Sequence, residues 1–180
     1  MPTSDQPIRD DRGVWKKALV TVPLIVVLGF VMGIVSNSGF ANGWYADLAK
    51  PSFQPPGWAF GVVWSTLYTM MGIALAVVLD APTSAERSRG LALFAVQLLF
   101  NFSWSPTFFG AHAIDLALLI ILANAMLATA TIISFWRVRP LAGALLLPYL
   151  AWLCLATALN VETGRLNLGA GTHSLGITGA

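Results

Sequence analysis

The sequence predicts an all-α integral membrane protein: a bundle of five transmembrane helices with a structured Pro/Trp-rich loop between the first two. Composition indicates the membrane, because 57% of the 180 residues are hydrophobic, only 10% are charged, and the mean hydropathy is +0.74. In soluble domains, about a quarter of the residues are charged. Five apolar segments reach the length of about 20 helical residues that crosses about 30 Å of hydrocarbon. They lack strand-like alternation, and backbone groups in lipid must be hydrogen-bonded internally, so helices are expected.

The five predicted spans contain no Lys, Arg, Asp or Glu. They run approximately over residues 18–35, 58–79, 91–109, 116–136 and 141–159. The length suits one membrane domain, which we assign to residues 18–168. We expect a polar, disordered N-terminal tail over residues 1–17 and a Gly-rich, flexible C-terminal tail over residues 169–180.

Basic residues divide unequally between the two sides of the predicted bundle. One side holds Arg9, Arg12, Lys16, Lys17, Arg87, Arg89, Arg137 and Arg139, and the other holds only Lys50 and Arg165. By the positive-inside rule, the N-terminus is cytoplasmic, while the first loop and the C-terminus are periplasmic in a bacterial inner membrane. Because the excess positive charge serves insertion, the pI near 9.0 predicts no nucleic-acid partner.

The connection between the first two spans is stiff and aromatic. Its sequence "WYADLAKPSFQPPGW", residues 44–58, contains three prolines, and each fixes φ and biases its predecessor toward extended conformations. We therefore expect a non-helical strap that ends at Gly57, where the second span begins. The aromatic residues of the connection form either an interfacial belt or a lid across the bundle.

Polar and aromatic side chains share faces within three of the spans. Trp64 and Tyr68 are four residues apart. The segment "QLLFNFSWSP" aligns Gln97, Asn101, Trp104 and Ser105, and "PYLAWLCLATALN" aligns Pro148, Trp152, Ala156 and Asn160. Amides in hydrocarbon need partners, so these faces turn inward and meet one another or a ligand. Simple interhelical hydrogen bonds are one interpretation, and convergence on an apolar cavity with a few polar groups is the favoured one.

Three motifs in this order, "WYADLAKPSFQPPGWAFGVVWSTLY", "QLLFNFSWSPTFFG" and "PYLAWLCLATALN", resemble the tryptophan-rich sensory protein and translocator protein family. This family is also called TspO/MBR or the peripheral-type benzodiazepine receptors, and the resemblance covers residues 20–167. It implies a receptor or sensor that binds porphyrins such as protoporphyrin IX, in a pocket that opens toward the first loop, with no other cofactor required. It also implies benzodiazepine-type drug-like ligands, a homodimer within the membrane lipid and, in eukaryotic members, cholesterol.

The site residues follow from the resemblance by motif. The implied ligand-binding residues are Trp44, Phe53, Trp64, Tyr68, Asn101, Trp104, Tyr149, Trp152 and Ala156. Two departures are evident: Ser52 and Phe53 stand where the family often has Trp, and Arg165 lacks the Tyr of the cholesterol motif. Small residues at positions 90, 92 and 95 would permit close packing of two copies.

Three functions stay open. The first is a receptor that regulates or sequesters tetrapyrrole, and the second is a light-dependent porphyrin-degrading enzyme with Trp64 and Trp152 as its catalytic, redox-active residues. The third is a transporter of porphyrin or sterol-like ligands, which the absence of charged residues and of paired broken helices within the spans disfavours. With one Cys, two His and no HExxH or GxSxG pattern, neither a metal site nor an activated nucleophile is predicted. Asp115, near His112, is expected to cap a helix or to form an interfacial pair.

Overall fold

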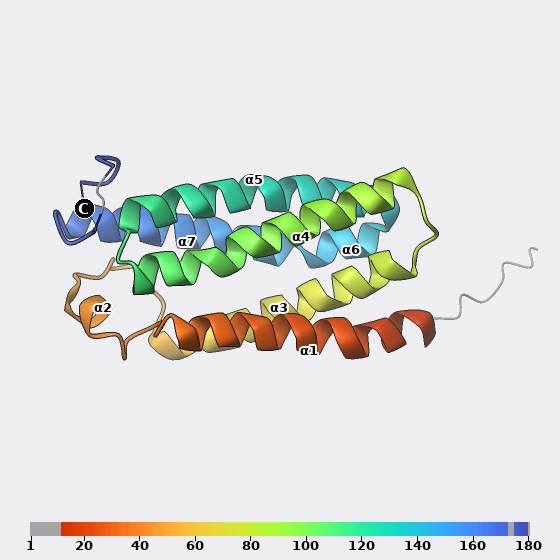
Figure 1. The fold of residues 1–180 in the computed structure, drawn as a ribbon, viewed down its shortest axis with the longest axis horizontal. Helices are drawn as coiled ribbons and strands as arrows, with labels where there is room; N and C mark the ends of the chain where they lie inside the picture. Colours follow the sequence, from red (N-terminus) through yellow and green to blue (C-terminus); the bar gives the residue numbers. More distant parts are fainter. Residues whose placement is uncertain (1–11, 173–174, 180) are drawn as a thin grey trace, which may run out of the picture.

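The computed structural model describes residues 12–172 and 175–179, whose regular structure is entirely helical (Figure 1). Within these residues, five helical stretches are long and apolar enough to cross a membrane, which confirms the predicted fold class. The helices are α1 (Arg12–Val35), α2 (Gly43–Asp47), α3 (Gly57–Asp80), α4 (Ala85–Ser105), the π-helical turn η1 (Pro106–Gly110), α5 (Ile114–Val138), α6 (Pro140–Leu145) and α7 (Leu147–Leu166).

The first helix begins earlier than predicted. Composition predicts a tail over residues 1–17, but α1 already begins at Arg12, and residues 1–11 lie outside the described part. The early start has a physical reason, since Lys17 Nζ donates to Asp80 Oδ1 at 2.5 Å and ties the first turns of α1 to the end of α3. Polar composition alone therefore placed the start of the helix too late.

Proline interrupts the third and fifth spans. The α4 helix continues into η1 at Pro106, where a residue without an N–H group ends the α-helical ladder and Ala111 N–H donates to Pro106 O at 2.8 Å. The fifth span breaks at Leu146, between α6 and α7, because Pro148 has no N–H group for the carbonyl four residues earlier. Each of these spans is nevertheless one helical stretch long and apolar enough to cross a membrane, Ala85–Gly110 and Pro140–Leu166.

The bundle consists of two close helix pairs joined by the fifth span. α1 packs along α3, and α4 packs along α5, while α6 contacts α3 and α5, and α7 contacts α5 (Figure 1). Glycine permits the close approach within the pairs, since a Cβ at Gly72 would lie 2.6 Å from Val22 Cα. Gly90 of α4 fits against α5, where a Cβ would lie 3.0 Å from Phe135 Cδ1.

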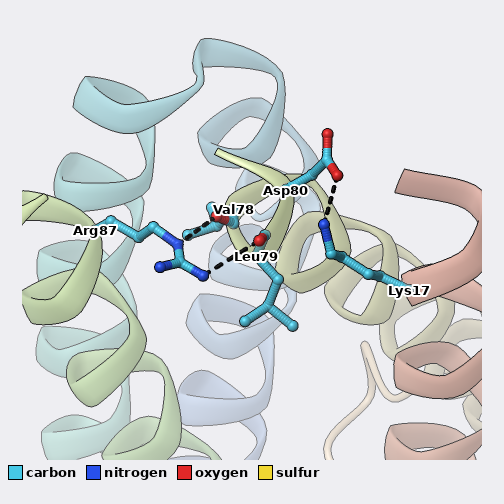
Figure 2. A network of polar contacts seen from close by, with 5 residues as sticks. All are labelled: Lys17, Val78, Leu79, Asp80 and Arg87. Atoms are coloured by element: carbon cyan, nitrogen blue, oxygen red, sulfur yellow. Dashed lines mark hydrogen bonds and ion pairs between the residues drawn. The ribbon is translucent and has the colours of Figure 1, made fainter. Parts of the chain in front are cut away.

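One end of the bundle carries the predicted basic side, and we call it the basic end. There Arg87 donates from Nε to Val78 O at 3.0 Å and from Nη2 to Leu79 O at 3.2 Å, beside the Lys17–Asp80 ion pair (Figure 2). Arg87 thus caps carbonyls of the last turn of α3, of which Val78 O also accepts from Ala81 N at 3.1 Å. Arg137 lies 3.6 Å from Glu86 at the same end. The predicted grouping of the three basic segments is confirmed.

The opposite end, which we call the loop end, is formed by residues 36–56 together with the C-terminal segment. α2 lies there beside the last turn of α7 and the residues that follow it (Figure 1). α2 places Trp44 and Tyr45 in a short helix before the strap, whose residues 50–56 are non-helical as predicted. A second small core, separate from the central core of the bundle, lies at this end and contains Tyr45, Leu48, Phe108, Ile114 and Ala117.

Candidate ligand cavity

A cavity of about 860 Å³ lies inside the bundle toward the loop end. All five spans and the first loop contribute to its walls, so its lining combines residues far apart in the sequence. Its volume is at the upper end of the range of about 300–1,000 Å³ that is usual for ligand pockets. The lining is predominantly aromatic and aliphatic with a few amides and hydroxyls, and none of the described lining residues is charged.

Six of the nine predicted binding residues line this cavity. They are Trp64, Tyr68, Asn101, Trp104, Trp152 and Ala156. The helical spacing of the three motifs therefore identified side chains that converge on one space. Pro148, placed on the same line of α7 by its spacing, is exposed and faces away from the cavity.

Three predicted residues do not line the cavity. The indole of Trp44 turns to the C-terminal segment, where Nε1 donates to Ala170 O at 3.1 Å and the ring stacks on His112 at 4.2 Å. Phe53 lies half-exposed in the strap. Tyr149 is buried behind the cavity wall and supports it. The first loop instead contributes Tyr45 and Gln54 to the lining, neither of which the motif comparison selected.

Aromatic rings from α3 and α7 form one wall. The ring centroids of Trp64 and Trp152 lie 6.3 Å apart with an interplanar angle of 84°, an edge-to-face contact. Tyr68, one turn along α3, lies 5.0 Å from Trp64, and Phe60 lies 5.6 Å from Trp152. These contacts hold the two indoles in fixed orientations beside the cavity.

A hydrogen-bond network ties four helices together at the base of the cavity. Tyr68 donates from its hydroxyl to Asn101 Oδ1 at 3.0 Å, and Asn101 Nδ2 donates to the Tyr149 hydroxyl oxygen at 3.1 Å. Asn124 of α5 also donates to Tyr149, from Nδ2 at 2.8 Å. Asn124 lines the cavity and was missed by the sequence analysis. The signal was present, because this residue is the one amide in the apolar segment 116–136.

A second amide stands nearer the loop end. Asn160 of α7 accepts from Trp104 Nε1 at 3.2 Å through Oδ1, and its Nδ2 donates to Ile114 O at 3.1 Å. The bond to Ile114 O ties α7 to the first turn of α5, next to the connection from η1. Asn160 thereby fixes the indole of Trp104 at the wall and joins α4, α5 and α7.

The first loop covers the cavity through its own polar contacts. Tyr45 donates from its hydroxyl to Gln54 Oε1 at 3.1 Å, which links α2 to the strap. Burial raises the pKa of Tyr45 above its ordinary value, although the bond with Gln54 opposes the shift, so the hydroxyl stays protonated as a donor. Ser38 and Ser105 share a hydrogen bond that joins the start of the loop to the end of α4.

Lys50 closes the end of α2. Its Nζ donates to the carbonyl oxygens of Tyr45 and Leu48 and lies 4.3 Å from the centroid of the Tyr45 ring. Burial lowers the pKa of Lys50, and the nearby carboxylate of Asp47 partly offsets this effect. A cation at these carbonyls stabilises the end of a helix.

The C-terminal segment is anchored to the loop end. Asp115, almost fully buried, accepts hydrogen bonds from the backbone N–H groups of Leu175, Ile177 and Thr178 at 2.8, 3.2 and 3.0 Å. The expected cap or interfacial pair with His112 is wrong, since Asp115 binds the tail and His112 stacks on Trp44. The described part of the predicted flexible tail is therefore held to the bundle by a buried carboxylate.

Asn167 joins this segment to the first loop. Its Oδ1 accepts from Ala49 N at 2.7 Å, and its Nδ2 donates to Ala49 O at 2.9 Å. Together with the bond from Trp44 to Ala170, this contact clamps the loop that covers the cavity. In the part of the chain that the structure describes, no group of three His, Cys, Asp or Glu side chains is placed to hold a metal ion.

Comparison with known proteins agrees with this architecture. The sequence model of the TspO/MBR family matches residues 20–166. Protein CrtK of Rhodobacter capsulatus is 42% identical over 71% of this chain and 81% of its own length. The translocator protein of Homo sapiens is 39% identical over 82% of this chain and 93% of its own. The tryptophan-rich sensory protein of Cereibacter sphaeroides is 39% identical over 69% and 77%.

The anchoring role of Asp115 is testable by replacement with Asn. The amide keeps one carbonyl oxygen but loses the charge and one acceptor, so the bonds to residues 175–178 weaken. We expect amide hydrogen exchange in residues 175–179 to become about tenfold faster, measured by mass spectrometry in detergent. Asp47→Asn, an exposed acidic residue at the same end, is the matched control and should leave that exchange unchanged. Equal protection in wild type and Asp115→Asn would contradict the anchor.

Proposed function

The chain belongs to the TspO/MBR family, and we propose that it is a membrane receptor that binds a porphyrin in the cavity beneath the first loop. Through this binding it would regulate or sequester tetrapyrrole. The observation that carries the proposal is the cavity itself, whose volume of about 860 Å³ is lined largely by aromatic and aliphatic side chains with only uncharged polar groups among them. Membership of the family and five membrane-spanning helices identify the chain as an integral membrane protein.

The chemistry of the walls suits a flat, largely apolar macrocycle. The indoles of Trp64 and Trp152 both line the cavity and meet each other edge to face at 84°. Aromatic surfaces pack well against an extended π-system, and the amide of Asn101 supplies a polar contact that fixes its orientation. Lining residues without charge favour binding over coupled transport, since proton- or ion-coupled carriers use charged groups in their pathway.

The indole pair supports a second candidate function, light-dependent breakdown of the bound porphyrin. Both indoles are electron-rich, line the cavity and contact each other. In this proposal, the porphyrin absorbs the light and supplies the reactive excited state, while the protein positions oxidisable rings beside it. Trp64 and Trp152 would then be catalytic residues.

We further propose that the protein lies in a bacterial inner membrane with its basic end in the cytoplasm. The three basic segments gather at one end of the bundle, and the loop end has only Lys50 and Arg165. This asymmetry is what the positive-inside rule relates to orientation. The cavity would then open toward the periplasmic side, beneath the first loop and the C-terminal segment.

Porphyrin binding is tested by titrating the purified protein with protoporphyrin IX in the dark and following tryptophan fluorescence. Wild type should show saturable quenching, and Asn101→Leu should weaken the affinity about fivefold, as expected for one net hydrogen bond of about 1 kcal/mol. Gln97→Leu removes a buried amide one turn away that does not line the cavity, and it should bind like wild type. Quenching without saturation would refute the proposed function, and equal affinity of Asn101→Leu would remove Asn101 from the site.

Illumination separates receptor from enzyme. Phe retains most of the packing area of Trp but is much harder to oxidise, so Trp64→Phe and Trp152→Phe should bind porphyrin within about tenfold of wild type. If the protein is an enzyme, both variants should slow the light-dependent loss of the porphyrin absorbance band severely. Trp58→Phe, an exposed tryptophan outside the cavity, should degrade it at the wild-type rate. If wild type bleaches porphyrin no faster than free porphyrin bleaches, the catalytic candidate fails.

Orientation is tested with reporter fusions in a bacterial inner membrane. A reporter fused after Ala180 should be active on the periplasmic side, and one fused after Ser84, before α4, should be active on the cytoplasmic side. Replacing both Lys16 and Lys17 by Gln, which both fusions contain, should weaken the asymmetry and reduce the difference between the two fusions. The reverse pattern in wild type would contradict the proposed orientation without affecting the fold.

A further inference from the structure

We propose that the ligand enters the cavity sideways from the lipid, through a gap between the loop-end halves of α1 and α3, and that Gly33 and Gly61 set the width of this gap. We call the gap the side opening. The inference rests on the proposed porphyrin binding, because it concerns the route into the same cavity. It implies that the ligand reaches the protein as a largely apolar molecule dissolved in the bilayer.

The exposed residues of the described cavity lining gather on one side. They lie in the last turns of α1, in the turn that follows it and in the first turns of α3, and they include Phe30, Ile34, Phe40, Gly57 and Gly61. The lining residues of α4, η1, α5 and α7 are buried or half-buried. The cavity is therefore closed toward these four elements and open between α1 and α3.

The two helices of this pair separate toward the loop end. Nearer the basic end they are in close contact, since Thr21 Oγ1 donates to Gly72 O at 2.7 Å and a Cβ at Gly72 would lie 2.6 Å from Val22 Cα. Gly33 and Gly61 lie equally far along the chain from Val22 and Gly72, in the direction of the loop end. A Cβ at either glycine would meet no atom within 4 Å. The space between the helices is therefore widest where both glycines line the cavity.

The side opening lies within the membrane-spanning stretches. Phe30, Gly33 and Ile34 belong to the span Gly13–Val35, and Gly61 belongs to the span Gly57–Asp80. Hydrocarbon surrounds such stretches, so a molecule dissolved in the lipid reaches the opening directly. On the side of the first loop, Phe40 borders the opening, because a Cβ at Gly57 would lie 2.9 Å from its ring.

The cover above the cavity is a less favourable route. Asn167 holds Ala49 through two hydrogen bonds, and Trp44 donates to Ala170 O, so passage through the cover would require these bonds to break. The residues that border the side opening are largely apolar. A largely apolar ligand that enters there need not pass through water between the bilayer and the cavity.

A residue that only narrows the route has a kinetic signature. It slows association and dissociation by the same factor and leaves the affinity unchanged, whereas a residue that contacts the bound ligand changes the affinity, mainly through the dissociation rate. Leucine at position 33 or 61 adds bulk at the side opening. It is also a better helix former than glycine, so the helix itself is not weakened.

The rates are measured in the dark on protein reconstituted in lipid vesicles. Stopped-flow tryptophan quenching by protoporphyrin IX gives association, and transfer of the porphyrin to an excess of protein-free vesicles gives dissociation. We expect Gly33→Leu and Gly61→Leu each to slow both rates about tenfold, with the affinity within about twofold of wild type.

Two controls separate the side opening from the cover. Gly43→Leu changes an exposed glycine of α2 that does not line the cavity and whose Cβ would meet no atom within 4 Å, so wild-type rates are expected. Asn167→Ala removes the clamp on Ala49 and should leave association at the wild-type rate, because the ligand does not pass there. If a leucine variant lacks the helix content of wild type by circular dichroism, Gly33→Ala or Gly61→Ala takes its place, with a smaller slowing of both rates expected.

The outcomes are distinct. Wild-type rates in the folded variants at positions 33 and 61 would overturn the side opening. Weaker affinity of these variants with unchanged association would overturn it too, because the glycines would then border the bound ligand and not its route. Faster association of Asn167→Ala would place the entry at the cover instead. Each of these results leaves porphyrin binding standing, whereas the absence of saturable binding by wild type would refute the proposed function and the route with it.

Discussion

The Tyr149 hydroxyl is the contact on which the arrangement of the bundle around the cavity depends. It accepts hydrogen bonds from Asn101 of α4 and Asn124 of α5, and Asn101 in turn accepts a hydrogen bond from the Tyr68 hydroxyl of α3. In a membrane, burial of apolar side chains does little to hold helices together, because lipid is as apolar as the helix surface. Packing and interhelical hydrogen bonds must fix their positions. One tyrosine on α7 thereby joins four helices at the base of the cavity.

At the loop end, non-helical segments cover the cavity, so hydrogen bonds between these segments must hold the cover in place. Its contacts join segments far apart in sequence: Asn167 holds Ala49, Trp44 holds Ala170, and Asp115 holds residues 175–178. The stiff strap contributes by losing little conformational entropy when it is ordered. The first loop and the C-terminal segment therefore act as one cover, and a change in either is transmitted to the other.

The sequence predicts features that depend on local chemistry. Length and hydropathy identified the five spans, and helical spacing brought Trp64, Asn101 and Trp152 to one cavity. Contacts made in three dimensions were not predictable in this way. Trp44 belongs to the first of the three motifs, yet its direction is set by Ala170 and His112, which lie more than 60 residues away. Asp115 likewise finds its partners in a tail that composition describes only as flexible. Asn124 was overlooked although the rule used for Asn101, that an amide in hydrocarbon needs a partner, applies to it equally.

The glycines at the cavity show that its space is not a by-product of poor packing. A Cβ at Gly29 would clash with the Tyr68 ring, so this glycine lets α1 approach the network. A Cβ at Gly33 or Gly61, by contrast, would meet no atom within 4 Å, although both residues line the cavity. Packing against the rest of the chain does not require a small residue at either position, and glycine is unfavourable within a helix by about 0.5–1 kcal/mol relative to alanine. A side chain at either position would reduce the room for a ligand. Glycine at positions 33 and 61 therefore leaves room in the cavity that packing within the described chain does not require.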